Sequence, residues 1–382
     1  MLYLQLEKNI VEMDNSQLIE ARKRLQSFLL PNLIGIDSFD EEDVISIFME
    51  KSIKNTELSR NSLRLTEEIS PDIDKIICNV CSRLQIPRAL VNVFVFPSSE
   101  LNGFCIVNEL PIIVGVSSTT VNMLDKDELA FVLGHEIGHA LFKETSNFIA
   151  NSNCLEDQIL ARSIEICVDR IGLLTANNQD AAFRAILKSL SGLDEKHLRF
   201  DFSHFISESR DSMNANIPSH LLYSSHPPLP QRFRALLAFA MSDVFLRASG
   251  SDGIGAVPIE QVNNVIQSNL NNTIDDKANQ IIKESQLDLL TWLASFLIIS
   301  KKTINLSQFK SHFQLEVSKS QLERAAVFID GYNTEERSIV INEKIRESLV
   351  KATKIAPRAT SKLLKKVKEI YPEFHLQVLK YD

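Results

Sequence analysis

Residues 125–142 read DKDELAFVLGHEIGHALF, and this stretch decides how the rest of the chain is interpreted. Its apolar residues recur at helical spacing, and Asp125 stands where a helix N-cap is expected. Asp127 and Glu128 fall in the first turn, where acidic side chains stabilise a helix. The pattern predicts a helix over about 122–143.

The predicted helix carries an HExxH pattern at His135, Glu136 and His139. Positions i and i+4 project from one helix face, so the two imidazoles can point at one metal ion. Glu136 lies one step round the helix, where it can take a proton from a metal-bound water. The pattern is typical of zinc metalloproteases, although a chain with eight histidines can also contain it by coincidence.

A third ligand is needed, because catalytic zinc usually takes three from the protein. The segment 163–174, SIEICVDRIGLL, lies in a predicted helix over 156–175 and places Glu165 and Asp169 on one face. Two acids one turn apart usually lie on a solvated face, but these interrupt an apolar helix and need partners. Glu165 can complete a His/His/Glu site, and Asp169 can orient a ligand histidine.

A proline-rich segment follows at 224–233, SSHPPLPQRF. His226 precedes a rigid turn and is well placed to reach into a cleft. A surface turn is the alternative interpretation of this segment.

The order HExxH, ExxxDxxG and HPxxxxR resembles the gluzincin metallopeptidases of the HtpX and CAAX-prenyl-endopeptidase type. Upstream, NGF at 102–104 is similar to the Asn-Ala-Phe of that family. The resemblance covers roughly 65–245. It implies an α+β, mostly helical fold, with a zincin-type peptidase domain built from an active-site helix and a small sheet.

The resemblance also implies the roles of the matched residues. His135, His139 and Glu165 would hold one Zn²⁺ per chain, and Glu136 would be the general base. Asp169 would accept a hydrogen bond from the ring nitrogen of a zinc-binding histidine that does not face the metal. His226 would stabilise the oxyanion of the tetrahedral intermediate or act as a fourth ligand. Arg232 would anchor the loop of His226 through an acidic partner.

Three short segments rich in Val, Ile and Phe predict strands at 91–96, 104–107 and 111–118. An extended substrate is expected along an edge strand, for which 111–118 is the candidate. An ordinary core strand is the alternative. The expected substrate-binding residues are Asn102, Phe104, Ile113 and Val114.

The chain is expected to divide into a helical N-terminal region at 1–60, a peptidase domain at 61–248, a linker at 249–275 and a helical domain at 276–382. Within the second of these, 61–90 is predicted as a helix. The linker is predicted from three glycines in 250–255, Pro258 and an Asn-rich stretch. The last domain is expected to recruit a protein partner. It faintly resembles tellurite-resistance-B-like helical domains through IDG at 329–331, followed by Glu335 and Glu336.

Composition narrows the classes of function. The 382 residues carry a formal net charge of −8, which argues against a general nucleic-acid binder. No apolar run reaches the length of a transmembrane span, no signal peptide is recognisable, and five cysteines are sparse. We expect a soluble cytoplasmic zinc endopeptidase that cleaves soluble or peripheral proteins and is regulated by its flanking helical regions. The alternative is a metallopeptidase-like chaperone or adaptor scaffold, but Glu136 favours the enzyme.

Overall fold

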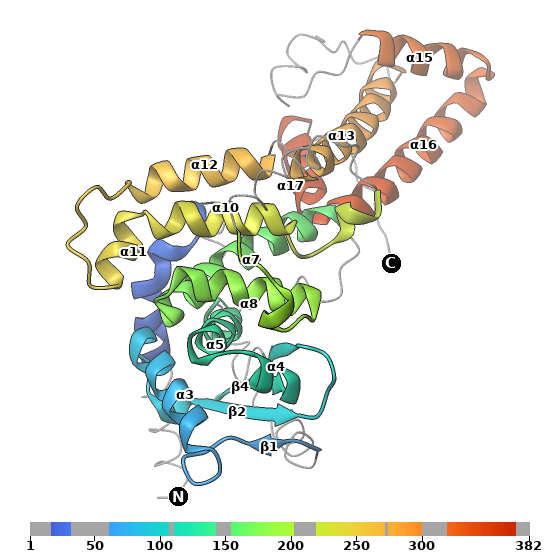
Figure 1. Cartoon of the computed structure of the whole chain (residues 1–382). Coiled ribbons are helices and arrows are strands. Elements are labelled where there is room, and N and C mark those ends of the chain that lie inside the picture. Colours follow the sequence, from blue (N-terminus) through green and yellow to red (C-terminus); the bar gives the residue numbers. More distant parts are fainter. Residues whose placement is uncertain are drawn as a thin grey trace, which may run out of the picture. The chain divides into compact units, whose positions relative to one another are not determined.

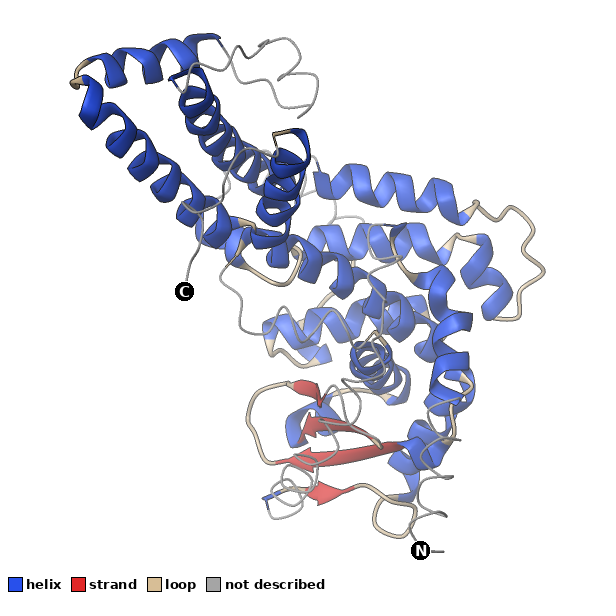
Figure 2. Ribbon diagram, turned by 180° about the vertical axis from the view of Figure 1, so that it is seen from behind, coloured by secondary structure: helices blue, strands red, loops and turns tan. Residues whose placement is uncertain are grey.

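The computed structural model describes residues 17–31, 61–106, 111–142, 154–201, 219–271, 274–299 and 319–371. The chain divides into two compact units (Figure 1). Unit 1 comprises Met1–Ala150, Leu160–Asn216 and Ser225–Leu270, and unit 2 comprises Asn151–Ile159, Ile217–Ser224 and Asn271–Asp382. Helices dominate, and a small sheet lies in unit 1 (Figure 2). The expected α+β, mostly helical fold is therefore confirmed.

The sheet has the strand order β1-β2-β4-β3. Its strands are β1 (Leu63–Arg64), β2 (Val91–Phe96), β3 (Gly103–Ile106) and β4 (Ile112–Ser117). β2 and β4 run parallel, while β1 and β3 pair antiparallel with their neighbours. Every residue of β4 is buried, as expected of an inner strand. The prediction that 111–118 forms an edge strand is therefore wrong, and among the described strands β3 lies at that edge.

The helices of unit 1 pack on this sheet and on one another. They are α3 (Pro71–Leu84), α4 (Ser118–Met123), α5 (Lys126–Leu141), α7 (Leu155–Ala176), α8 (Gln179–Ser191), α10 (Leu229–Ala240), α11 (Asp243–Ala248) and α12 (Ile259–Asn271). The residues of α7 up to Ile159 and the last residue of α12 belong to unit 2. Short 3-10 turns occur at Gln26–Phe28, Arg88–Leu90, Glu195–His197 and, in unit 2, Ser219–Tyr223. The helix predicted over 61–90 begins only at Pro71, because proline suits the first helical position and β1 precedes it.

The described part of the N-terminal region, 17–31, belongs to the core of unit 1. Residues 17–25 are helical, and Leu25, Phe28 and Leu30 join the same apolar cluster as the central helices. The buried guanidinium of Arg170 on α7 donates to the Phe28 carbonyl at 2.9 Å. The remainder of the predicted region 1–60 lies outside the described residues.

The segment predicted as a linker contains a helix. Residues 249–258 form turns with one isolated bridge, but α12 occupies Ile259–Asn271. Val262, Ile266 and Leu270 recur four residues apart and are buried in the core of unit 1. These apolar positions outweigh the Asn-rich composition that suggested a linker.

Unit 2 is helical in its described residues. Its main elements are α13 (Ile274–Ile299), α15 (Lys319–Asp330), α16 (Thr334–Ile355) and α17 (Pro357–Ile370). Its apolar core includes Leu289, Leu293, Ile341 and Ile345. The Glu336 side chain completes a capping box at the start of α16, which accounts for one of the acids after IDG.

The sequence predicts that no apolar run is long enough to be a transmembrane span. Among the described residues, no helix combines the length and the apolar character needed to span a lipid bilayer.

Candidate metal centre

The start of α5 is fixed by a buried charge network. Asp125 and Glu128 form a reciprocal capping box, in which each side chain accepts from the other residue's backbone N–H. The fully buried Glu128 carboxylate also pairs with Lys188 at 2.7 Å and Arg184 at 2.7 Å, both on α8. A buried carboxylate needs such partners, so this network anchors α5 to α8 at a defined position.

Glycines let α5 and α7 approach closely. A Cβ at Gly134 of α5 would lie 1.9 Å from the Thr175 hydroxyl oxygen, and one at Gly172 of α7 would lie 2.8 Å from the Phe131 carbonyl oxygen. Neither position has room for a larger side chain. This close packing brings the acidic residues of α7 beside the histidines of α5, and it explains the glycines within and beside the motifs.

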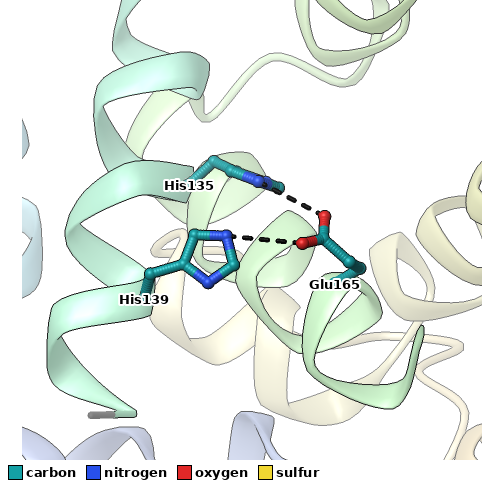
Figure 3. A group of neighbouring side chains, drawn as sticks. All are labelled: His135, His139 and Glu165. Atoms are coloured by element: carbon teal, nitrogen blue, oxygen red, sulfur yellow. Dashed lines mark ion pairs between the residues drawn. The ribbon is translucent and has the colours of Figure 1, made fainter. Parts of the chain in front are cut away.

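His135, His139 and Glu165 meet at this contact (Figure 3). One ligand atom from each lies within 4.8 Å of the others, and the Glu165 carboxylate oxygens lie 3.5 Å from each histidine Nε2. Glu165 is buried, and its Oε2 has no hydrogen-bond partner among the described residues. Two imidazole nitrogens and one carboxylate form a donor set that zinc prefers, and an unpartnered buried oxygen calls for a cation. The residues present therefore fit a zinc ion.

Behind the cluster, Asp169 links His135 to Arg232. Asp169 Oδ1 lies 3.0 Å from His135 Nδ1, which leaves Nε2 facing Glu165. The guanidinium of Arg232, from α10, donates to both Asp169 oxygens at 2.8 and 2.6 Å. A carboxylate held in this way fixes the orientation of a metal-binding imidazole.

The electrostatics follow from burial and from these pairs. Burial raises the pKa of Glu136 to about 7 and lowers the pKa of His139 to about 4. Burial alone would raise the pKa of Asp169, but the charge and hydrogen bonds of Arg232 hold it well below its usual range. Asp169 is therefore a permanent anion, while His139 stays neutral and able to donate a lone pair to a metal.

Glu136 faces the edge strand β3. A Cβ on Gly103 would lie 2.9 Å from Glu136 Oε1, so the strand passes directly beside this carboxylate. Side chains alternate along a strand, which turns Cys105 toward the same face and Phe104 toward the opposite one. The sequence named Gly103 only as part of the NGF match and did not single out Cys105, although alternation from Gly103 could have indicated Cys105.

The predicted substrate-binding residues are placed differently from one another. Asn102 is exposed at the start of β3, and its backbone is held by Ser117 and Thr120. The Phe104 ring occupies the space above Gly115 of β4. Ile113 and Val114 are fully buried in β4, so their assignment as substrate contacts is corrected. Ile113 and Val114 were predicted to contact substrate because β4 was expected to lie at the edge of the sheet.

His226 reaches the cluster from the proline-rich segment before α10. Its Nε2 lies 3.5 Å from Glu165 Oε2, the same oxygen that faces His135. The Ser225 hydroxyl lies 3.0 Å from its Nδ1, and 61% of the His226 side chain is exposed. His226 thus lies at the solvent-exposed side of the cluster formed by His135, His139 and Glu165.

Comparison with known proteins gives one match. Residues 67–160 match the model of Peptidase family M48, a stretch that includes β2 to β4 and the HExxH helix and ends before Glu165. No curated protein and no solved structure matches the chain. The chain is thus similar to Peptidase family M48 over this stretch, which contains His135 and His139 of the His/His/Glu cluster.

Proposed function

We propose that this chain is a zinc-dependent endopeptidase of the HtpX type. The observation that carries the proposal is the meeting of His135, His139 and Glu165, with Glu165 Oε2 buried and without a hydrogen-bond partner among the described residues. A catalytic zinc takes three protein ligands and keeps a position open for water or substrate. Glu136, next to His135 on the same helix, supplies the base that hydrolysis requires.

Each residue of the site has a part in peptide hydrolysis. When bound, zinc lowers the pKa of a coordinated water and polarises the scissile carbonyl. Glu136 takes the proton of the attacking water on its carboxylate and delivers it to the leaving amine. Asp169, fixed by Arg232, keeps His135 in the tautomer whose Nε2 faces the metal position. His226 donates to the developing oxyanion or serves as a fourth ligand.

The proposed substrate is an extended segment of a soluble or peripheral protein. β3 lies at an edge among the described strands and passes beside Glu136, so the backbone groups that it does not share with a described strand can pair with a peptide. Pairing of this kind recognises the main chain and reads little sequence. All five cysteines are free thiols, which fits the proposed cytoplasmic location.

Regulation by the flanking helical region is part of the proposal. In the first turn of α7, the Glu156 carboxylate accepts from the backbone N–H groups of Arg358 and Ala359 at the start of α17, at 2.9 and 3.0 Å. Arg358 also pairs with Asp157 at 2.7 Å. The same helix carries Glu165 farther along, so a change at α17 can be transmitted to a zinc ligand.

Casein cleavage tests the proposal. The full chain, loaded with zinc, should cut casein into fragments, and a chelator should stop the cleavage until zinc is returned. Absence of cleavage by the zinc-loaded chain would contradict the enzyme and favour the adaptor scaffold. Cleavage that a chelator leaves unchanged would contradict the metal mechanism.

A further inference from the structure

Unit 2 contains a cavity that the proposed peptidase does not use. It lies between α13, α15 and α16, opens to solvent, and has a volume of about 550 Å³. Sites that take small ligands or a few side chains are typically of this size, roughly 300–1,000 Å³.

One part of the cavity lining is aromatic. Trp292 of α13 and Phe328 of α15 meet edge to face, with ring centroids 5.8 Å apart. Phe328 remains 40% exposed, which is high for a phenylalanine that packs in a helical unit. Aromatic surface left open in a cavity favours an apolar group as its occupant.

Some of the charged side chains around the two aromatic rings have partners, and others do not. Lys344 Nζ lies 2.7 Å from Glu347, and Asp288 accepts a hydrogen bond from Ser348 at 2.8 Å. Arg324 of α15 and Lys351 of α16 also line the cavity, and neither has an ion-pair or hydrogen-bond partner within the described part of the chain. The lining carries a net charge of +1, from Arg324, Lys344 and Lys351 against Asp288 and Glu347, although the whole chain is acidic. Two of these cations, on different helices, have no ion-pair partner among the described residues.

We propose that this cavity binds an acidic peptide segment of a partner protein, with one bulky apolar side chain flanked by carboxylates. The apolar side chain would pack on Trp292 and Phe328. The carboxylates on either side would pair with Arg324 and Lys351, which approach from two helices. A simple anion would leave the aromatic surface exposed, whereas a purely apolar ligand would leave both cations unpaired.

Trp292 makes the proposal directly measurable. It is the only tryptophan of the chain, so a change in tryptophan emission reports on the cavity alone. The probes are three capped pentapeptides of sequence EEFEE, QQFQQ and EEAEE, titrated into the full chain. EEFEE should give a saturable change in emission, while QQFQQ and EEAEE should bind roughly tenfold more weakly or worse. This result does not depend on the peptidase proposal, because no zinc or turnover is involved.

Charge-reversal variants locate the binding site. Arg324→Glu and Lys351→Glu should each weaken EEFEE binding by about tenfold or more. Lys354→Glu is the matched control, because Lys354 is an exposed lysine on the same helix and does not line the cavity. All three residues are exposed, so circular dichroism should show an unchanged fold.

Three outcomes would overturn the proposal. The first is no saturable response to EEFEE, and the second is equal binding of EEFEE and QQFQQ. The third is an equal loss of binding in the Lys354→Glu control, which would indicate general attraction to a basic surface.

Discussion

Charged side chains gather both near the α5–α7 contact of unit 1 and around the helical cavity of unit 2. The two regions differ in how far these charges are buried and in whether they are paired. Beside the α5–α7 contact, the Asp169–Arg232 pair between α7 and α10 is nearly buried, with side-chain exposures of 1% and 12%. Around the cavity the Lys344–Glu347 pair is 33% and 58% exposed, and two further cations are unpaired. A buried charge is costly unless an opposite charge or hydrogen bonds compensate it, whereas an exposed charge is solvated by water and can remain unpaired until a ligand binds. The difference separates the proposed catalytic site, whose charges are held in place, from the proposed docking site.

The largest effect is expected from substitution of Glu136, the proposed general base. Glu136→Gln removes the proton acceptor and should lower kcat/KM for casein by about 10²–10⁴-fold. Zinc content should stay unchanged, because Glu136 is not among the proposed ligands. Steady-state cleavage and metal analysis on the same preparation check both points. A variant that retains most of its activity would rule out this role for Glu136.

The buried pair should matter next. Arg232→Met leaves the Asp169 charge buried without its main partner, and such losses cost roughly 3–5 kcal/mol of stability. Urea denaturation of the variant and the wild type measures this cost. A change in the free energy of unfolding below about 1 kcal/mol would show that the Asp169–Arg232 pair contributes no more than the exposed pair of unit 2.

The glycine contact gives a smaller expected effect. Gly172→Ala places a Cβ about 2.8 Å from the Phe131 backbone, and overpacking of this kind costs about 1–3 kcal/mol. Gly331→Ala in unit 2 is the matched control, since its nearest neighbour would lie 3.4 Å away. Equal destabilisation by the two substitutions in urea would contradict close packing as the cause.

The smallest effect is expected at the exposed pair. Lys344→Ala breaks the contact with Glu347 on one face of α16, and exposed pairs contribute at most about 1 kcal/mol. The thermal midpoint should therefore barely move. A loss as large as that of Arg232→Met would erase the distinction between the two regions.

The sequence predicts the catalytic helix well because its signals are local. The capping box at Asp125 and Glu128 and the helical spacing of His135 and His139 require no knowledge of distant residues. The pairing of Asp169 with Arg232 is also anticipated in type, since a buried acid needs a partner.

The features that sequence reasoning misplaced depend on non-local pairing. β4 is internal because of the strand order, which depends on residues distant in the sequence. The continuous apolar run of β4 is consistent with a fully buried strand, and the prediction of an edge strand did not use it. The N-terminal segment joined the core of unit 1 through Phe28 and Arg170, which lie far apart in the sequence. α12 is a different case, because its signal is local. Its asparagines led to the prediction of a linker, although Val262, Ile266 and Leu270 recur at helical spacing.

The cavity of unit 2 was not anticipated at all. Trp292 lies partly buried at the cavity wall. The cations Arg324 and Lys351 resemble any exposed basic residue in sequence, because their shared cavity arises from three helices.

Zinc analysis of the purified chain tests the central claim most directly. Protein prepared without chelator should contain about one zinc per chain, as a His/His/Glu site requires. Glu136→Gln should contain the same amount, and Glu165→Gln should lose most of it. A wild-type chain that takes up no added zinc, or a Glu165→Gln variant that binds zinc as tightly as the wild type, would contradict the account.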